Sequence, residues 1–519
     1  MFCDKTALIV SLPQASVAEM LDAAAQAAGR GADMVEYRLD CLADLDESSL
    51  AALLAHKPLP VIATFRPTRQ GGRYADDESR RLALLAAAAR LGADYVDVEY
   101  DVPLDQRPPG RKILSFHDFH SRPDNLPAIL NDLCRSEADV VKIAFASRGP
   151  EDCLAAWELI RRSSKPAIVI AMGEHGLPSR LLAKKFGAFG TFASLETGRE
   201  SAPGQVSLER MRSLYRWEQV GPGTDIYGVI GCPLGHSMSP AIHNAALAKE
   251  EIDAVYVPLR IEPKAADFQR FFDAVQNSPW AGWAGFSVTI PHKEAAFDLV
   301  GAENLDELSR RIGAINTIRM DADGGLAGWN TDYAAIIDAL TEAMGIPRNG
   351  LMGRTVAVLG AGGVARAAVA ALTHYGARVT VYNRTPQRGK RLAEEFSAKA
   401  LPMTALPEMS AEIILHCTSV GMHPAVDATP MPRELLDRLQ RDLRDSGGGR
   451  KLVVFESIYN PLQTLLLRHA AQAGCLCISG VEMFVRQAAA QFELWTGRAA
   501  PRELVRQVVL RHLAAEKHD

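Results

Sequence analysis

The stretch RTVAVLGAGGVARAAVAALTHYGARVTVYNR, residues 354–384, decides the fold of the second half of the chain. A β-branched run, a glycine-rich turn, an alanine-rich run and a second β-branched run predict strand, turn, helix and strand. Gly360 allows the tight turn, Gly362 lets the backbone approach a pyrophosphate, and Ala365 is small where helix and strand pack. We therefore predict a Rossmann domain with an anionic dinucleotide at the helix N-terminus.

The end of the second strand indicates which dinucleotide this domain binds. Asn383, Arg384 and Thr385 follow Gly363 by about 20 residues, where NAD-specific proteins tend to place an acid. An arginine at that place favours the 2′-phosphate of NADP, and an exposed loop arginine is the alternative. The sequence thus predicts NADP(H) as the cofactor.

Residues 225 to about 330, upstream of the Rossmann segment, alternate short apolar runs with polar motifs. Lys293 follows a proline-containing turn, and its ammonium could donate a proton to a developing alkoxide. Asp332 is either a helix N-cap or a partner that holds Lys293 charged. The hydroxyls of Ser237 and Ser239 could face a carboxylate, or belong to a turn and a helix cap.

The first half repeats one pattern eight times. Helical segments such as DDESRRLALLAAAARLG, residues 76–92, separate most of its apolar runs. Strands alternating with helices imply a parallel sheet, and eight units in about 215 residues fit a (β/α)8 TIM barrel better than an open doubly wound sheet. The runs are TALIVSL (6–12), MVEYRLD (34–40), PVIATFR (60–66), YVDVEY (95–100), KILSFHDF (112–119), VVKIAF (140–145), AIVIAMG (167–173) and GTFAS (190–194).

Lys142, within the sixth run, is the most informative residue of this half. Reactive groups of parallel barrels lie at the carboxyl ends of the strands. An apolar wall around Lys142 would favour the neutral amine, which can attack a ketone to form a Schiff base. His117 on the neighbouring run could move protons, and we prefer it to His120, which lies beyond the strand. The alternatives are a lysine that reaches solvent and a satisfied core histidine.

Other polar residues near the strand ends have both functional and structural interpretations. Arg66 and Arg180 could clamp a carboxylate, or could be ordinary surface arginines. Glu36 and Arg38 could bind a substrate or form a structural ion pair. Three further residues are expected at the same site: Ser11, Ser201 and Gln205.

Charge and composition exclude several classes of protein. In 519 residues, 57 Lys and Arg nearly balance 62 Asp and Glu, giving a net charge of −5. This balance argues against nucleic-acid and membrane-surface binding, and no apolar run approaches the ~18 residues of a membrane span. The eight cysteines show no zinc spacing, so we expect neither a metal nor disulfides. We recognise no targeting segment and expect a cytoplasmic protein.

A polar stretch punctuated by Gly221, Pro222 and Gly223 predicts a linker between the two halves. The expected organisation is a barrel over 1–218, a linker over 219–224, a substrate domain over 225–332 that 481–519 complete, and a Rossmann domain over 333–480.

The motifs EYRLD, TFR followed by GG, SFHDFH, VVKIAF and SAPGQ together resemble type I 3-dehydroquinate dehydratases over residues 6 to about 217. The resemblance implies a Schiff base between Lys142 and the C3 ketone of 3-dehydroquinate. His117 would take the C2 proton and help expel the C1 hydroxyl as water. Gln70 occupies a position where the family often has an acidic residue near the histidine. The missing carboxylate could weaken the orientation or basicity of His117 and so lower the rate of dehydration without changing the reaction. The substrate-binding residues implied are Glu36, Arg38, Arg66, Arg180, Ser201 and Gln205.

The second half resembles shikimate dehydrogenases over residues 225 to about 515, and Lys293 and Asp332 match their catalytic pair. The motifs are GHSMSP, VTIPHK, AINT, NTD, GAGGVAR, NRT, TSVGM and GVEMFVRQAAAQFELWTG. Substrate contacts are implied for Ser237, Ser239, Thr289, Asn316, Asp332, Tyr459, Gln487 and Gln491. An NADP site is implied for Gly360, Ala361, Gly362, Gly363, Val364, Ala365, Asn383, Arg384, Thr385, Thr418 and Gly480. Ser287 stands where many bacterial members have Asn, and Phe484 stands where many have Leu. Both departures resemble the fused plant-type enzyme.

Together the two resemblances imply a bifunctional lyase and oxidoreductase of the shikimate pathway, which leads to chorismate and the aromatic amino acids. Its partners would be 3-dehydroquinate, 3-dehydroshikimate and shikimate, and the chain would act as a monomer or a homodimer. One alternative is a non-catalytic sensor of quinate-pathway metabolites on the same folds, against which the presence of Lys142, His117 and Lys293 argues. Another is a quinate-directed dehydrogenase, against which the crowding by Ser239 and Thr289 argues.

Overall fold

The computed structural model describes residues 5–198, 202, 204–235, 237–446 and 450–515 and divides into two compact units. The first unit holds the chain up to residue 235 together with residues 253–283. The second holds residues 236–252 and the chain from residue 284 onward. The domain boundaries expected at residues 218, 225, 332 and 480 stay predictions.

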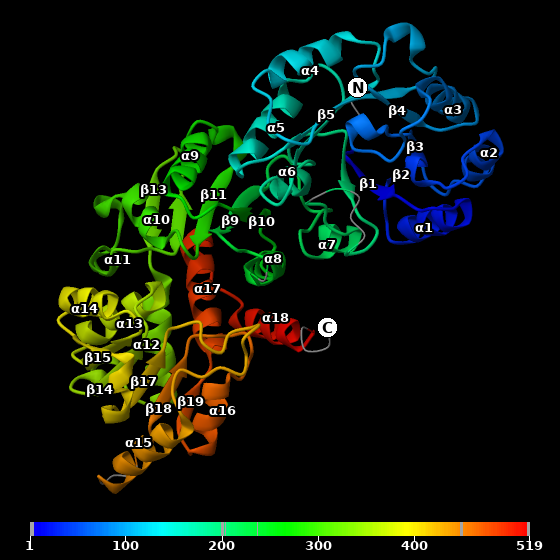
Figure 1. Ribbon diagram of the computed structural model, residues 1–519. Coiled ribbons are helices and arrows are strands. Elements are labelled where there is room, and N and C mark those ends of the chain that lie inside the picture. The colour runs from blue at the N-terminus through cyan, green and yellow to red at the C-terminus, as the bar shows by residue number, and fades with distance from the viewer. Residues whose placement is uncertain (1–4, 199–201, 203, 236, 447–449, 516–519) are drawn as a thin grey trace. The chain divides into compact units, whose positions relative to one another are not determined.

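The first unit contains a parallel sheet in the order β7-β6-β5-β4-β3-β2-β1-β8 (Figure 1). The N–H of Phe189, just before β8, donates to the carbonyl of Ala167 at the start of β7, so the sheet returns on itself. This confirms the predicted TIM barrel, and each of the eight predicted runs contains a strand. The strands are β1 (Ala7–Leu12), β2 (Met34–Arg38), β3 (Val61–Thr64), β4 (Tyr95–Glu99), β5 (Lys112–Asp118), β6 (Val140–Ala146), β7 (Ala167–Met172) and β8 (Gly190–Ala193).

Helices α1, α2, α3 and α7 of the barrel begin at a Ser or Asp whose side chain caps them. Ser16 accepts a hydrogen bond from the N–H of Glu19, and Asp77 accepts one from Ser79. Such caps satisfy N–H groups that have no partner within the helix. The helices are α1 (Val17–Gly29), α2 (Glu47–Ala55), α3 (Glu78–Arg90), α4 (Leu126–Arg135), α5 (Glu151–Arg162), α6 (Leu177–Leu181) and α7 (Leu208–Ser213).

Side chains inside the barrel change character along the strands. A buried apolar cluster that includes Ile9, Ile62, Ile113 and Ile168 fills the part near the amino ends. On β2, β5 and β6, a buried polar residue follows a member of this cluster two positions later: Glu36 after Met34, Ser115 after Ile113 and Lys142 after Val140. The fold therefore leaves room for a polar site at that end, as is usual for parallel barrels.

An aromatic cluster packs the barrel against the segment that follows it in the same unit. The ring of Trp157 stacks on Phe186 at 4.5 Å between centroids, and the Arg161 guanidinium lies 4.2 Å from the Trp280 ring. The burial of large rings contributes strongly to packing. The elements of this segment are β9 (Asp225–Gly231), β10 (Ala254–Arg260) and α9 (Ala265–Gln276).

The second unit contains a parallel sheet in the order β16-β15-β14-β17-β18-β19, which confirms the Rossmann prediction. Its strands are β14 (Thr355–Leu359), β15 (Arg378–Asn383), β16 (Lys399–Pro402), β17 (Ile413–His416), β18 (Val453–Glu456) and β19 (Leu476–Ile478). Two apolar cores pack on its two faces. The covering helices are α13 (Gly363–His374), α14 (Pro386–Glu395), α15 (Arg433–Asp445) and α16 (Leu465–Gln472).

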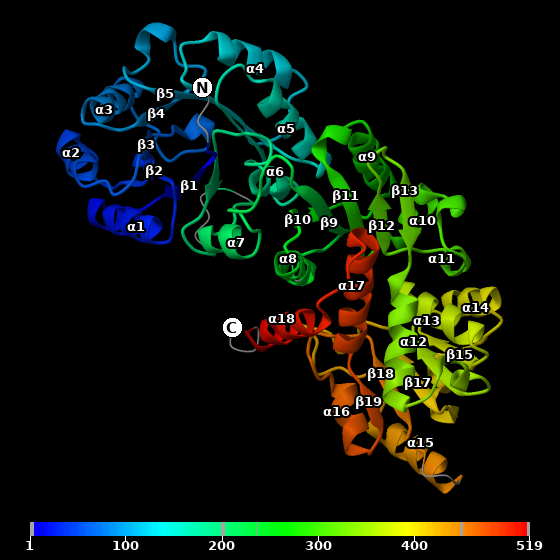
Figure 2. The same cartoon turned by 180° about the vertical axis from the view of Figure 1, so that it is seen from behind.

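The remaining elements of the second unit frame its polar site. Helices α12 and α17 run side by side in both views (Figures 1 and 2), and the Trp495 indole Nε1 donates to the carbonyl of Ile318 at 3.0 Å. Among the described residues no helix is long and apolar enough to cross a membrane. These elements are α8 (Ser239–Lys249), β11 (Trp283–Val288), α10 (Lys293–Val300), α11 (Glu307–Ile312), β12 (Thr317–Met320), β13 (Leu326–Trp329), α12 (Thr331–Met344), α17 (Gly480–Thr496) and α18 (Arg502–Ala515).

Candidate active sites

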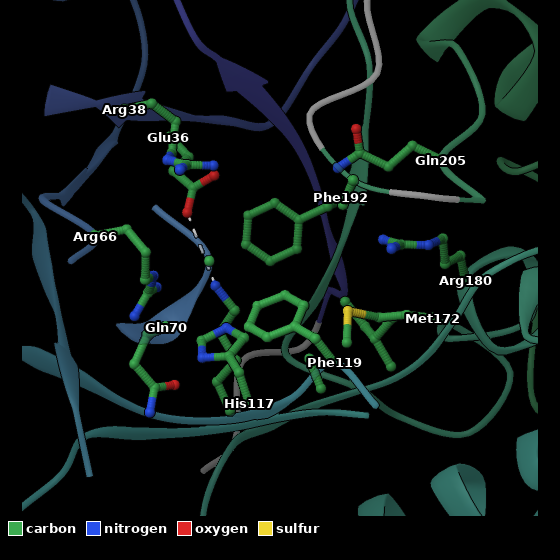
Figure 3. Close-up of a pocket in the computed structure, with 15 residues that line it drawn as sticks. Glu36, Arg38, Arg66, Gln70, His117, Phe119, Met172, Arg180, Phe192 and Gln205 are labelled. Carbon is green, nitrogen blue, oxygen red and sulfur yellow. Dashed lines mark ion pairs between the residues drawn. The ribbon is translucent and has the colours of Figure 1, made fainter. Parts of the chain in front are cut away.

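One pocket at the carboxyl ends of the barrel strands gathers most of the residues that the sequence predicted there (Figure 3). These residues come from different parts of the first half and meet only because parallel strands end at one edge. The predicted residues that line it are Glu36, Arg38, Arg66, His117, Lys142, Arg180 and Gln205, and Gln70 lines it with them.

Lys142 projects from β6 into this pocket and is buried. Its Nζ lies 2.9 Å from an oxygen of Asp97 and 3.8 Å from one of Glu36, and 4.5 Å from the centre of the Phe192 ring. The apolar wall expected from the flanking sequence is therefore only part of its surroundings. Two carboxylates face the amine because β2 and β4 bring them to the same depth as β6.

A buried chain of charges surrounds Lys142. The guanidinium of Arg66 pairs with Asp97 and with Glu99, each at 2.7 Å. Burial alone would raise the pKa of Asp97, but the charges of Arg66 and Lys142 outweigh it and hold that pKa well below its usual range. At Glu99 burial prevails over Arg66 and Arg81, so its pKa is raised. Asp97 is therefore the fixed anion beside the lysine.

Glu36 and Arg38 are each held by a neighbour. The hydroxyls of Ser11 and Thr64 donate to the two oxygens of Glu36 at 2.6 and 2.9 Å. The Arg38 guanidinium donates to both oxygens of Asp40, at 2.9 and 2.7 Å. Ser11, predicted as a substrate ligand, thus lies behind Glu36, and Asp40 orients Arg38.

His117 lies in the same pocket, and its Nδ1 is buried without a hydrogen-bond partner. Burial, together with the nearby charges of Arg66 and Lys142, lowers its pKa well below the ordinary value. The ring of Phe119 stacks parallel to it, 5.7 Å away. Oε1 of Gln70 is also buried without a partner. His117 is therefore a neutral imidazole that can accept a proton.

Arg180 differs from the other pocket arginines in its surroundings. Its Nε is buried without a hydrogen-bond partner, and burial lowers the pKa of its guanidinium to about 10. No acid of the described residues pairs with this guanidinium, and a buried cation in that position favours the binding of an anion. Gln205 lines the pocket, and Ser201 lies outside the described residues.

The sequence interpretation missed the acids of the fourth run. Asp97 and Glu99 are both fully buried on β4. Their alternation within YVDVEY was a usable signal, because two carboxylates at period two in a short apolar run point to the same face. Phe119, Met172 and Phe192, which complete the pocket wall, had no comparable signal.

In the second unit, Lys293 and Asp332 meet as predicted. Nζ of Lys293 lies 2.5 Å from one oxygen of Asp332, and the Asn316 amide donates to the other at 3.0 Å. Asn330, the N-cap residue of α12, accepts the N–H of Asp332. The Gln491 amide donates to the carbonyl of Asn316 at 3.0 Å. One hydrogen-bonded chain thus joins four of the predicted residues.

The other predicted substrate residues form local contacts. The N–H of Ser239 donates to the Ser237 hydroxyl at 3.4 Å, at the start of α8. The Tyr459 ring packs on Phe484 at 4.6 Å, and the Gln487 amide donates to the carbonyl of Phe484. Thr289 follows β11, and its carbonyl accepts the N–H of His292, next to Lys293.

The glycine turn after β14 has the form that a dinucleotide requires. A Cβ on Gly360 would lie 3.0 Å from the Cys417 carbonyl oxygen, whereas one on Gly362 would meet nothing within 4 Å. Gly362 is the N-cap of α13, so the first N–H groups of the helix, which have no acceptor within it, point out of the helix N-terminus toward the turn. A Cβ on Gly363 would lie 3.5 Å from Cδ of Lys293, which places the turn beside the Lys293–Asp332 pair.

The remaining predicted cofactor residues surround this turn. Arg384 follows β15 and is exposed, and the Asn383 amide donates to the carbonyl of Thr385 at 2.8 Å. Thr418 follows β17, and its methyl group would lie 3.0 Å from a Cβ on Gly360. Gly480 begins α17, where a Cβ would collide with the Ile458 carbonyl. Ala361, Val364 and Ala365 belong to the turn and the first turn of α13.

Four family models match successive parts of the chain. Type I 3-dehydroquinase matches residues 8–222, and the shikimate dehydrogenase substrate binding domain matches residues 229–318. Shikimate / quinate 5-dehydrogenase matches residues 345–436, and the shikimate 5′-dehydrogenase C-terminal domain matches residues 480–510.

Known proteins resemble the chain over its halves and over its whole length. A chloroplastic bifunctional 3-dehydroquinate dehydratase/shikimate dehydrogenase of Arabidopsis thaliana is 37% identical over 96% of this chain and 83% of its own. An NADP(+) shikimate dehydrogenase of Methanosarcina acetivorans is 39% identical over 56% of this chain and 99% of its own. The solved dehydroquinate dehydratase and shikimate dehydrogenase of S. pombe AroM is 26% identical and covers 98% of each chain, with a TM-score of 0.44.

Proposed function

The chain belongs to the family of bifunctional 3-dehydroquinate dehydratase/shikimate dehydrogenases, and from that premise we propose which residues carry each reaction. The protein dehydrates 3-dehydroquinate to 3-dehydroshikimate and reduces this ketone to shikimate with NADPH. The observation that carries the assignment of residues is the pocket that unites Lys142, His117 and Arg180.

Lys142 is the nucleophile of the barrel. Its amine attacks the C3 carbonyl of 3-dehydroquinate, and loss of one water leaves an imine on Nζ. Asp97 lies 2.9 Å from Nζ and retains Arg66 as a second cationic partner when Nζ becomes part of the imine. The acid is thus stabilised throughout the reaction and holds the lysine in position.

His117 moves the protons of the elimination. A neutral imidazole takes the C2 proton, which the imine acidifies, and the resulting imidazolium then protonates the C1 hydroxyl as it leaves. The low pKa of His117 keeps the base form available at neutral pH. Hydrolysis of the imine returns Lys142, so the overall reaction removes one water from the substrate.

Arg180 binds the substrate carboxylate. Its buried guanidinium has an Nε without a partner, and a carboxylate would supply the missing acceptor. Glu36 and Arg38 orient substrate hydroxyls, since Ser11, Thr64 and Asp40 hold their side chains still. Gln205 lines the same site, and Ser201 is proposed as a further substrate ligand from the sequence alone.

In the dehydrogenase, Lys293 donates a proton to the oxygen of the C3 ketone. Asp332, 2.5 Å away, keeps the ammonium charged and accepts a hydrogen bond from the same hydroxyl in the product. The Asn316 amide holds the acid from the other side, and Gln491 in turn holds the Asn316 carbonyl. The substrate carboxylate and ring hydroxyls are bound by Ser237, Ser239, Thr289, Tyr459 and Gln487.

The turn around Gly360 fits NADP(H), because its glycines leave space where side chains would collide or fill the cradle. The N-terminus of α13 would hold the pyrophosphate, Arg384 with Asn383 and Thr385 the 2′-phosphate, and Thr418 and Gly480 the remainder. When bound there, NADPH supplies the reducing equivalent for the ketone beside Lys293. Among the described residues, no group of three or more His, Cys, Asp or Glu side chains is arranged to hold a metal ion.

A coupled assay tests both sites at once. Purified full-length protein is supplied with 3-dehydroquinate and NADPH, and NADPH absorbance and product identity are followed. Shikimate forms without any added enzyme. Lys142→Arg serves as the matched control, which consumes NADPH only when 3-dehydroshikimate is supplied. No consumption with either substrate would overturn the proposal in favour of the metabolite sensor, and oxidation of quinate faster than shikimate would favour the quinate-directed alternative.

The place and state of action are also proposed. The cysteines that the structure describes are all free, which supports a reducing compartment such as the cytoplasm. The named Arabidopsis relative is chloroplastic, so fractionation of the source cell decides between the two. The chain acts as a monomer or a homodimer on small molecules, without nucleic acid or membrane as a partner, and light scattering distinguishes the two states.

A further inference from the structure

A carboxylate, an imidazole and a hydroxyl form a buried chain at the carboxyl end of the six-stranded sheet. His416 ends β17 and Glu456 ends β18, directly opposite in register, and neither is exposed. Nδ1 of His416 lies 2.9 Å from both oxygens of Glu456, and its Nε2 lies 2.5 Å from the hydroxyl of Thr418. No step of the reactions described above uses His416 or Glu456.

The hydrogen bonds around Glu456 decide where the protons lie. The carboxylate accepts the N–H of Ile458 at 3.0 Å and the hydroxyl of Thr464 at 2.9 Å. Thr464 caps α16 by accepting the N–H of Leu467, so its own proton points to Glu456. An ionised carboxylate can only accept. We assign His416 the neutral tautomer in which Nδ1 donates to Glu456 and Nε2 accepts the Thr418 proton, because this arrangement satisfies all three groups.

This arrangement fixes the orientation of the Thr418 hydroxyl. Its proton is directed at His416, and its oxygen accepts the N–H of Val420 at 3.2 Å. A hydroxyl has one donor and two acceptor positions, so one acceptor position is left. Thr418 lies against Gly360, the first glycine of the nucleotide turn. The remaining lone pair is therefore available beside the cofactor site.

We propose that His416 and Glu456 are positioning residues that hold the Thr418 oxygen as an acceptor for an N–H or O–H donor of bound NADP(H). The inference rests on the proposed contact of Thr418 with the cofactor. A role in folding alone explains the pair poorly, since burying an ionised carboxylate is costly and an apolar pair would pack as well. Three residues from two strands and a loop instead share one defined proton arrangement.

A double-mutant cycle on NADPH binding tests the proposal in the full-length protein, with affinity measured by calorimetry. Thr418→Val removes the acceptor, and we expect about three- to tenfold weaker binding, the usual effect of one hydrogen bond. His416→Phe keeps the ring shape, removes both nitrogens and weakens binding to a similar extent. In a protein that already carries Thr418→Val, His416→Phe weakens NADPH binding further by less than about twofold, because His416 acts on the cofactor only through the Thr418 hydroxyl.

Three controls make the outcomes distinct. Thr418→Ser keeps the hydroxyl and binds NADPH nearly as wild type. Leu439→Ala, a buried position of α15 on the same sheet, lowers the unfolding temperature without changing NADPH affinity. Near-ultraviolet circular dichroism and a cooperative thermal unfolding transition show that the second unit of each variant is folded, and dehydration of 3-dehydroquinate in the same samples shows that the barrel is intact. If His416→Phe does not fold, Glu456→Gln, which keeps the side-chain size, replaces it in the cycle.

Each outcome decides one claim. If Thr418→Val binds NADPH as tightly as the wild type, Thr418 does not contact the cofactor and the inference is overturned. A loss in Thr418→Val without one in His416→Phe would leave the contact and overturn the positioning role. If the double variant loses NADPH affinity by the product of the two single losses, His416 affects binding independently of the Thr418 hydroxyl, and the positioning role is overturned.

Discussion

The two units place a lysine next to an aspartate, and the surroundings of the two pairs differ. Lys142 and Asp97 lie 2.9 Å apart in the barrel, with side chains 8% and 0% exposed. Lys293 and Asp332 lie 2.5 Å apart and are 13% and 5% exposed. Asp97 also pairs with Arg66, whereas the second carboxylate oxygen of Asp332 accepts a hydrogen bond from the neutral Asn316 amide.

This difference matches what each lysine has to do. A lysine that acts as a nucleophile must lose its proton. The acid beside it therefore needs a second cationic partner that stays in place after the amine has reacted. A lysine that donates a proton works from its charged form, and one close acid with neutral neighbours is sufficient. The same pair of residue types can therefore serve two kinds of chemistry, depending on the charges behind the acid.

The largest expected effect comes from Lys142→Ala. We expect dehydration to fall by on the order of 10⁴-fold or more, because the covalent route is lost. NADPH-dependent reduction of 3-dehydroshikimate stays unchanged. Borohydride reduction with 3-dehydroquinate, read by mass spectrometry, labels the wild type alone. Lys142→Arg keeps a cation for Asp97 and is equally inactive, and label retained in either variant would show that the nucleophile lies elsewhere.

Lys293→Ala is expected to do the reverse. Loss of the proton donor lowers the rate of ketone reduction by roughly 10²- to 10⁴-fold, measured by NADPH absorbance at saturating 3-dehydroshikimate. Dehydration and borohydride labelling remain at wild-type levels. A loss of both activities would contradict the separation of the two sites.

Comparing Asp97→Asn with Asp332→Asn measures how much the cationic partners of each acid contribute to the free energy of unfolding. Asp97→Asn leaves Lys142 and Arg66 buried with one counter-charge fewer, and we expect it to cost about 3–5 kcal/mol of unfolding free energy. Asp332→Asn leaves a single, slightly more exposed lysine without its counter-charge, and we expect a smaller loss than for Asp97→Asn. Urea unfolding followed by circular dichroism gives both values, and equal losses would remove the distinction drawn between the two pairs.

Arg384→Ala tests whether Arg384 binds the 2′-phosphate of NADPH. A lost charge-assisted contact of about 1.5–3 kcal/mol corresponds to roughly 10- to 150-fold weaker NADPH binding. The affinity for NADH changes by less than about twofold, since NADH lacks that phosphate. Arg388→Ala, at an exposed position of the helix α14 that follows Arg384, serves as a comparison. Equal losses for the two cofactors would refute the contact of Arg384 with the phosphate.

Gln70→Glu is expected to have the smallest effect and concerns the base of the barrel. Burial and the charges of Arg66 and Lys142 lower the pKa of His117, so its base form persists well below pH 6.5. An added carboxylate in the pocket would stabilise the imidazolium and raise that pKa. The acid limb of the pH profile of dehydration should then move to higher pH, and the rate at pH 7.5 should rise by a few-fold. An unshifted limb would mean that another group titrates there.

Several features of the fold and sites followed from neighbouring residues. The turn at Gly360 and its flanking strands lie within one stretch of sequence, and the structure confirms them. Lys142 and His117 were recognised because strands β5 and β6 adjoin and their polar residues interrupt apolar runs. In such cases the residues that define the feature are close in sequence, so periodicity and spacing reveal them.

Other features were decided only by the tertiary structure. Asp97 is 45 residues from Lys142, and Glu456 is 40 from His416. Arg81 lies on an outer helix with a polar pattern, yet it is fully buried and pairs with Glu99. Whether such groups meet depends on strand register and on the depth of each side chain, which sequence spacing does not encode. Burial then fixes their charges, because in a medium of low dielectric an ion requires a partner at hydrogen-bond distance.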